Sequence, residues 1–155
     1  IPYDMDKVLA AIDKRHEAGK GFTILAVAEG AISKEDAALS KKELKKKREN
    51  SPYPSVSYEI AKIIGERTGS EARVTVPGHT QRGGSPCPYD RVLCTRLGSA
   101  AAEAILEKDY GYMIAMKNGT TKRVPLENVA GKLKMVDPDC QMIQEAKRIG
   151  ISFGD

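Results

Sequence analysis

The stretch Arg73-Val-Thr-Val-Pro-Gly-His79-Thr-Gln-Arg82-Gly-Gly-Ser-Pro-Cys-Pro-Tyr-Asp-Arg91 decides which fold the sequence predicts. A short β-branched run over 73–76 ends at a Pro-Gly pair, a polar loop follows, and two prolines then open a helix. Open α/β sheets hold their ligands at the carboxyl ends of their strands, in loops that lead into helices. The stretch therefore predicts an α/β protein with a ligand site at this loop.

The loop concentrates hydrogen-bond donors that suit a phosphate group. Arg73 and Arg82 each offer a planar fork to phosphate oxygens, and His79 and Gln81 can add further donors. The Gly83-Gly84 pair allows close approach of the backbone to a ligand, or a positive φ. A plain surface turn with exposed basic residues explains the same spacing, so the spacing alone leaves both interpretations open.

Length and composition indicate one globular domain. The 155 residues are 41% hydrophobic, with no Trp and only two Phe, so the core has to come from aliphatic residues. No apolar run approaches the ~20 residues that span a bilayer, and we expect no membrane partner.

Cys87, Cys94 and Cys140 fit no metal-binding spacing, which favours reduced thiols and a cytoplasmic location. An Ile in place of an initiator Met at position 1 favours a segment of a longer chain.

The basic character of the chain comes from a single segment. The net charge is +4, and residues 41–49 contribute six positive and two negative charges, so the other residues sum to zero. We expect this segment to be a solvated helix. A nucleic-acid-binding module working through residues 41–48 is the alternative, but the segment lacks interleaved aromatic residues for base stacking, and we expect no nucleic-acid partner.

Hydrophobic periodicity and turn residues predict the elements of a three-layer α/β/α fold with a mostly parallel sheet. The carboxylate of Glu29 follows one expected strand directly, at the ligand edge of that sheet. The expected helices cover 4–19, 32–50, 57–68, a long stretch that begins at 85, 126–131, and a last stretch that begins at 138; the expected strands cover 22–28, 73–76, and a hairpin of 112–116 with 121–124.

The motif Pro-Gly-His79-Thr-Gln-Arg82-Gly-Gly-Ser-Pro-x-Pro-Tyr-Asp90-Arg91 resembles the signature of the phosphofructokinases. Val27-Ala-Glu29-Gly30 and Glu71-Ala-Arg73 are similar to further segments of that family, as are residues 111–118 and 150–155. The resemblance covers nearly the whole chain, and it implies the C-terminal lobe of a phosphofructokinase fold.

The resemblance implies a fructose 6-phosphate site. In that family the positions of Arg82 and His79 contact the 6-phosphate, and Thr80 and Gln81 belong to the same binding loop. The position of Glu29 accepts hydrogen bonds from sugar hydroxyls. The position of Arg73 reaches the phosphate of a neighbouring subunit, which implies a homodimer or homotetramer.

The resemblance also implies which parts of the family's active site are absent from residues 1–155. The family's donor-phosphate loop, its Mg²⁺-binding aspartate and its catalytic aspartate lie in a preceding half, and no segment here matches them. We therefore expect residues 1–155 to be the sugar-phosphate-binding part of a 6-phosphofructokinase, inactive alone and holding no catalytic or metal-binding residue. Residues 85–136 are expected to pack with the missing lobe.

The phosphoryl donor and the role of the domain have alternatives. The long segment between Gly30 and Gly69 resembles the branch that uses pyrophosphate or either donor, so ATP and pyrophosphate are both open. A non-catalytic regulatory or interaction domain of the same fold is the alternative to a substrate-binding part. The presence of the four charged site residues, Glu29, Arg73, His79 and Arg82, favours the substrate-binding part.

Overall fold

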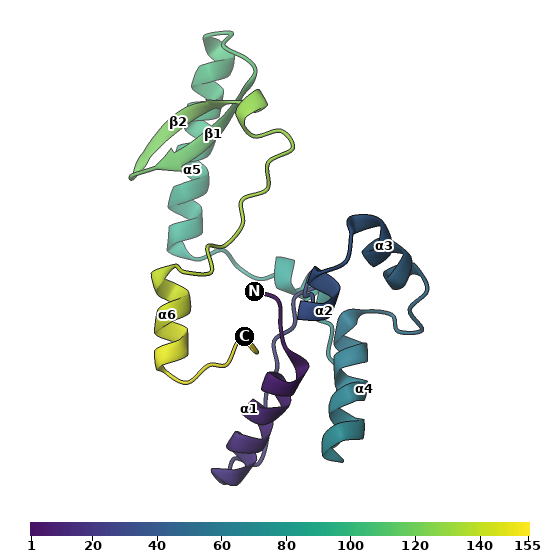
Figure 1. Cartoon of the computed structure of the whole chain (residues 1–155). Helices are drawn as coiled ribbons and strands as arrows, with labels where there is room; N and C mark the ends of the chain where they lie inside the picture. Colours follow the sequence, from purple (N-terminus) through teal and green to yellow (C-terminus); the bar gives the residue numbers. More distant parts are fainter. The chain divides into compact units, whose positions relative to one another are not determined.

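The computed structural model describes residues 1–155 and combines α-helices with one small sheet (Figure 1). The chain forms two compact units, one of Ile1–Val76 with Asp137–Asp155 and one of Pro77–Val136. The elements in chain order are α1 (Met5–Glu17), α2 (Lys34–Ala37), α3 (Lys41–Glu49), α4 (Val56–Thr68), the 3₁₀ turn η1 (Gly78–Arg82), α5 (Pro88–Leu106), β1 (Tyr112–Lys117), β2 (Thr120–Pro125), the 3₁₀ turn η2 (Leu126–Asn128) and α6 (Gln141–Arg148).

Helix α1 confirms the helix that the sequence predicts over 4–19. Asp4 caps it, because its Oδ1 accepts a hydrogen bond of 3.0 Å from the backbone N–H of Asp6. The chain leaves the helix through Gly19, which takes a φ of +74°. Leu9 is the buried residue of this helix.

The lysine-rich segment forms two helices, α2 and α3, where the sequence predicts one over 32–50. Ser40 starts the second helix through a capping box with Glu43. The backbone N–H of Ser40 donates to Glu43 Oε2 at 2.9 Å, and the backbone N–H of Glu43 donates to Ser40 Oγ at 3.3 Å. Because this reciprocal pair satisfies the first free N–H groups of a new helix, it favours a restart at this point. Lys47 of α3 forms an ion pair with Asp36 of α2.

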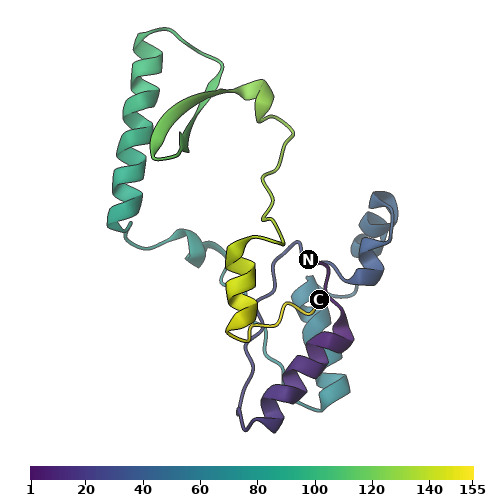
Figure 2. The ribbon, with the colours of Figure 1, turned by 60° about the vertical axis from the view of Figure 1, so that its left-hand side comes forward.

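Helix α4 buries Ile60 and ends at Gly69, which takes a φ of +69°. An ion pair of 2.9 Å between Arg67 Nη2 and Asp6 Oδ1 joins α4 to α1, and Figure 2 shows the two helices beside one another. Leu9 and Ile60 are the two buried apolar side chains of this unit. The predicted helix over 57–68 is confirmed.

The parallel strands predicted over 22–28 and 73–76 are wrong for this structure. Both segments run without a hydrogen-bonded ladder, and the only sheet is the antiparallel pair of β1 and β2. A strand requires a neighbour that accepts its N–H groups and donates to its C=O groups, and neither apolar segment has one. Phe22 and Ile24 are consequently 71% and 81% exposed. The mixture of helices with a small sheet still confirms the α/β class.

The chain after residue 136 returns to the first unit. Helix α6 begins at Gln141 and not at the expected Pro138, because Asp137 Oδ1 accepts the backbone N–H of Asp139 at 2.9 Å and holds a turn there. The carbonyl oxygen of Gly154 accepts the backbone N–H of Asp4 at 2.7 Å, so the last residues lie against the start of α1. Figure 1 shows the two termini near one another.

The second unit consists of α5 and the β1–β2 hairpin, with Ala104 as its buried residue. The predicted hairpin is confirmed, and its turn residues Asn118 and Gly119 both take positive φ, at 50° and 74°. Arg123 of β2 forms ion pairs with Glu107 and Asp109, at 2.7 and 2.6 Å, directly after α5. The short helix expected over 126–131 is the 3₁₀ turn η2.

None of the helices combines the length and the hydropathy that crossing a bilayer requires.

Candidate functional site

Four of the predicted site residues share one turn. His79, Thr80, Gln81 and Arg82 lie on the 3₁₀ turn η1, which the sequence predicts only as a loop. The turn closes through a hydrogen bond of 3.1 Å from the N–H of Thr80 to the carbonyl of Pro77. A second bond of 3.2 Å runs from the N–H of Gly83 to the carbonyl of Thr80. A turn this short buries no side chain, so all four side chains are exposed.

The side chains of this turn are free of internal partners. The four polar groups are the His79 imidazole, the Thr80 hydroxyl, the Gln81 amide and the Arg82 guanidinium. None of them makes a hydrogen bond or an ion pair with another part of the chain. A cation, an imidazole and two neutral polar groups within one turn can supply several donors to an oxyanion. This arrangement can therefore bind a phosphate group without first breaking an internal contact.

The segment after η1 leads directly into α5. Gly84 takes a φ of +97°, the positive φ that the glycine pair allows, whereas Gly83 takes an ordinary φ of −100°. The prediction that Pro86 and Pro88 both lie in the first helical turn holds only for Pro88, because α5 begins at Pro88. Arg91 donates its Nε–H to the carbonyl of Pro86 at 3.2 Å.

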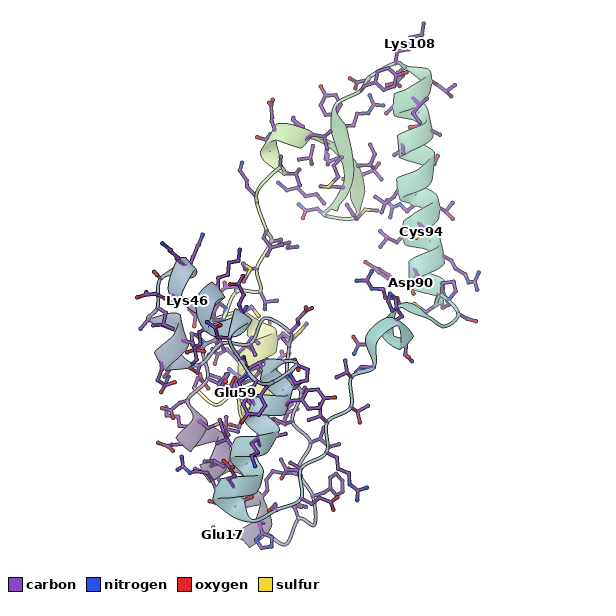
Figure 3. The ribbon with its side chains drawn as sticks, turned by 90° about the vertical axis from the view of Figure 1, so that its right-hand side faces the viewer. Glu17, Lys46, Glu59, Asp90, Cys94 and Lys108 are labelled. Carbon is purple, nitrogen blue, oxygen red and sulfur yellow. The ribbon has the colours of Figure 1, made fainter.

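A carboxylate fixes the start of α5. Asp90 Oδ2 accepts a hydrogen bond of 3.0 Å from the backbone N–H of Cys87. Hydrogen bonds from the Cys87 side chain and backbone lower the pKa of Asp90 below its ordinary value. Figure 3 shows Asp90 at one end of α5, Cys94 further along it, and Lys108 beyond its other end. The carboxylate thus caps the helix.

The remaining two predicted site residues belong to the first unit. Glu29 follows the extended segment 22–28 in a turn closed by a hydrogen bond of 3.0 Å from the N–H of Ala31 to the carbonyl of Ala28. Arg73 lies in the extended segment after α4, and its Nε donates to Glu71 Oε1 at 2.8 Å. The prediction that these two residues share one site with the η1 residues stays a prediction, because the residues divide between the two units.

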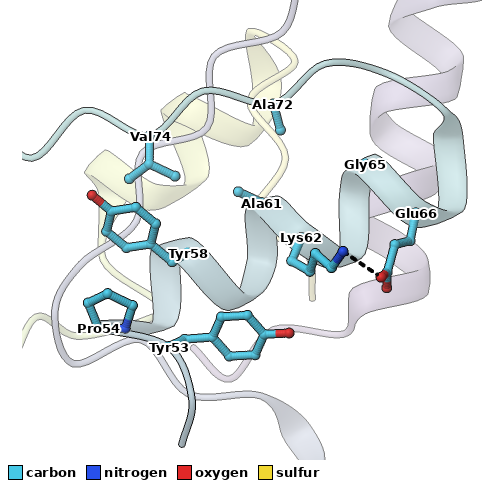
Figure 4. A pocket seen from close by; sticks show the side chains of 9 residues that line it. All are labelled: Tyr53, Pro54, Tyr58, Ala61, Lys62, Gly65, Glu66, Ala72 and Val74. Atoms are coloured by element: carbon cyan, nitrogen blue, oxygen red, sulfur yellow. Dashed lines mark ion pairs between the residues drawn. The ribbon is translucent and has the colours of Figure 1, made fainter.

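The structure also holds a groove that the sequence does not predict. It has a volume of about 610 Å³ and runs along α4 (Figure 4). Lys62 and Glu66 form an ion pair of 3.0 Å on its edge, and the hydrogen bond that Lys62 donates to the Glu66 carboxylate raises the pKa of Lys62. The lining residues are Tyr53, Pro54, Tyr58, Ala61, Lys62, Gly65, Glu66, Ala72 and Val74.

No predicted site residue lines this groove. Its sequence signal is the pair of small residues Ala61 and Gly65, one helical turn apart, beside two tyrosines. Neither the groove nor any other part of the chain gathers three or more His, Cys, Asp or Glu side chains in the way a metal ion requires.

Comparison with known proteins decides the family. The family profile described as Phosphofructokinase matches residues 1–105. This chain belongs to the phosphofructokinase family.

Curated relatives of this phosphofructokinase chain match it along its whole length. The "ATP-dependent 6-phosphofructokinase" of Spirochaeta thermophila is 48% identical over 155 residues, and that of Propionibacterium freudenreichii is 37% identical over 172 residues. The "ATP-dependent 6-phosphofructokinase 2" of Clostridium perfringens is 41% identical over 160 residues. The alignments cover 100% of this chain but only 42%, 46% and 43% of those proteins, so the chain spans less than half of their length.

The names of these relatives bear on the phosphoryl donor. All three are named as ATP-dependent, so the expected likeness to the pyrophosphate-using branch finds no support among them.

Proposed function

We propose that this chain is the fructose 6-phosphate-binding part of an ATP-dependent 6-phosphofructokinase, which phosphorylates the 1-hydroxyl of the sugar. The turn η1 carries this proposal, since it presents His79 and Arg82 three residues apart in one turn, and neither side chain has an internal partner. Family membership and the names of the relatives support the reaction and the donor.

Each proposed residue has a role that its chemistry suits. The guanidinium of Arg82 and the imidazole of His79 donate hydrogen bonds to the 6-phosphate, with Thr80 and Gln81 as further donors in the same turn. Glu29 accepts hydrogen bonds from sugar hydroxyls, because a carboxylate only accepts. Arg73 adds a second guanidinium to a phosphate, in the site of a neighbouring subunit of a homodimer or homotetramer.

Phosphoryl transfer also requires a bound donor, a metal ion and a base that orients the sugar hydroxyl. Mg²⁺ is the metal that the family implies, but the acidic side chains of this chain form no cluster that fits it. We therefore assign metal binding and catalysis to residues outside these 155. The chain alone should form no fructose 1,6-bisphosphate from fructose 6-phosphate and ATP, and turnover by the purified chain would contradict this assignment.

Calorimetric titration of the chain with fructose 6-phosphate tests the proposed binding. We expect saturable binding to the unaltered chain and none with fructose, which lacks the phosphate. Arg82→Ala should weaken the affinity about tenfold or more, because a charge-assisted hydrogen bond to phosphate is lost. Arg48→Ala is the matched control, since Arg48 is an exposed arginine of α3 without an ion pair. Equal affinities of the unaltered chain and Arg82→Ala would refute the role of Arg82.

A further inference from the structure

Arg73 differs from the other proposed site residues because a partner already holds it. Its Nε donates a hydrogen bond of 2.8 Å to Glu71 Oε1, although the two side chains are 83% and 73% exposed. Glu29 and the four residues of η1 make no comparable contact. Neither Arg73 nor Glu71 makes a second ion pair, so the two form an isolated couple.

The couple leaves the phosphate-binding face of Arg73 free. A guanidinium carries five N–H donors in a rigid plane, and the bond to Glu71 uses the single donor on Nε. The four donors on the two terminal nitrogens remain, in the fork that matches two oxygens of a phosphate. A carboxylate on the Nε edge therefore orients the fork without occupying it.

We propose that Glu71 is a positioning residue for Arg73, which fixes the guanidinium so that its terminal nitrogens meet a phosphate ester. This inference rests on the proposed function, in which Arg73 binds the phosphate of fructose 6-phosphate. The i, i+2 spacing supports it, because alternate side chains of an extended segment lie on the same side of the backbone. An arginine side chain has many rotamers, so orienting it in advance lowers the entropy lost on binding.

The negative charge of Glu71 and its hydrogen bond to Arg73 have opposite effects on the binding of a phosphate ester. A carboxylate repels an anionic ligand, but both side chains are exposed, and water and salt screen that repulsion. The hydrogen bond is short-ranged and survives screening better, so we expect positioning to dominate. Two substitutions separate the effects: Glu71→Gln keeps an acceptor for Nε and removes the charge, whereas Glu71→Ala removes both.

The test measures fructose 6-phosphate affinity by calorimetry with the whole 155-residue chain. Glu71→Ala should weaken binding about three- to tenfold, and Glu71→Gln should stay within about twofold of the unaltered chain. In an Arg73→Ala background, Glu71→Ala should have no further effect. Glu49→Ala is the matched control, since Glu49 is an exposed glutamate in an ion pair of 3.7 Å with Lys45. The Nε–H resonance of Arg73 gives an independent signature, which Glu71→Ala should shift before ligand is added.

The possible outcomes separate this inference from the proposed function. Unchanged or tighter binding by Glu71→Ala, where Arg73→Ala weakens binding, overturns the positioning role while leaving the sugar-phosphate site in place. Full affinity of Arg73→Ala overturns it as well, because Arg73 would then make no contact with the phosphate. An effect of Glu71→Ala that persists in the Arg73→Ala background also overturns it, because Glu71 would then act through another group. A chain that binds no fructose 6-phosphate overturns the proposed function itself, and the inference with it.

Discussion

Gly154 is the most closely enclosed glycine of the chain. An added Cβ there would lie 2.7 Å from Cγ2 of Val8 and 3.4 Å from Cβ of Tyr3, and the residue takes a φ of +68°. Its carbonyl also accepts the backbone N–H of Asp4 at 2.7 Å. Any side chain at this position therefore meets both a strained backbone and a closed space.

Gly154→Ala should lower the free energy of unfolding of the first unit more than Gly19→Ala. Both glycines take left-handed backbone, at φ +68° and +74°, which costs an alanine about 1–2 kcal/mol. Only at position 154 does an added Cβ also collide with its neighbours, and this collision costs about 1–3 kcal/mol more. A Cβ added at position 19 would have no atom within 4 Å. Urea unfolding of both variants measures the difference.

A second substitution checks the cause of that difference. Val8→Ala removes the closest atom, so it should recover part of the stability that Gly154→Ala loses. Equal losses in Gly154→Ala and Gly19→Ala would show that Val8 and Gly154 are not in contact in solution.

The sequence predicts some of these residue-level roles and misses others for a physical reason. Asp4 is recognisable as a cap, and Gly19 as a helix stop, because each acts on residues close by in the chain. The enclosure of Gly154 depends on Val8, at the opposite end of the sequence, and no local pattern encodes it. The bond between Glu71 and Arg73 is local, but a glutamate two residues before an arginine is too common to single out.

At the scale of elements, the start of α5 depends on ionised Asp90. The hydrogen bonds from Cys87 hold the pKa of Asp90 below its ordinary 3.8, so they favour the charged carboxylate in the folded chain. Their contribution to stability is present above pH 3.8 and is lost as the pH falls through the lowered pKa. Acidification should therefore loosen the first turn of α5.

An NMR titration of the Cys87 amide proton tests this dependence on pH, because that amide donates to Asp90. Its chemical shift should change with a midpoint below pH 3.8, and Asp90→Ala should abolish the change. Glu103→Ala is the control, since Glu103 lies on the same helix and its side chain makes no hydrogen bond. A midpoint above 3.8, or a titration that survives Asp90→Ala, would contradict the capping role.

The elements that the sequence predicts correctly are those that local interactions specify. Helices α1, α4 and α5 follow from apolar periodicity and capping residues, and the hairpin follows from Asn118-Gly119. The segments 22–28 and 73–76 have strand-like composition, but a strand exists only with a partner, and composition does not supply one. Apolar periodicity does not reveal the division of 32–50, because the capping box of Ser40 and Glu43 carries no apolar signal.

At the scale of the whole molecule, the candidate site includes residues from segments that are distant in the chain, and local patterns do not bring such segments together. The donors of η1 form a recognisable cluster, because four of them fall within one turn. Glu29 and Arg73 lie in the other unit, and their residue types together with the family resemblance, rather than a local pattern, assign them to the same ligand. A cluster of donors within one loop is therefore predictable from residue types, whereas a site assembled from distant segments needs knowledge of the complete fold.

The exposed apolar residues of the chain predict concentration-dependent self-association. Ile24 and Leu106 are 81% and 83% exposed, yet they differ in setting: Ile24 lies in an extended apolar segment without a ladder, whereas Leu106 ends α5. An unpaired extended segment offers backbone donors and acceptors as well as apolar surface to another copy. Ile24→Lys should therefore weaken self-association about tenfold, from the loss of one buried aliphatic side chain.

Leu106→Lys is the matched control for that prediction, because it adds the same charge at an equally exposed leucine. Sedimentation velocity over a range of protein concentrations measures both variants against the unaltered chain. The charge alone reduces association in both by raising the net charge above +4, so the difference between the variants isolates the extended segment. If the two variants associate equally strongly, the segment 22–28 contributes no more to self-association than the end of a helix. Self-association would then depend on the total exposed apolar surface.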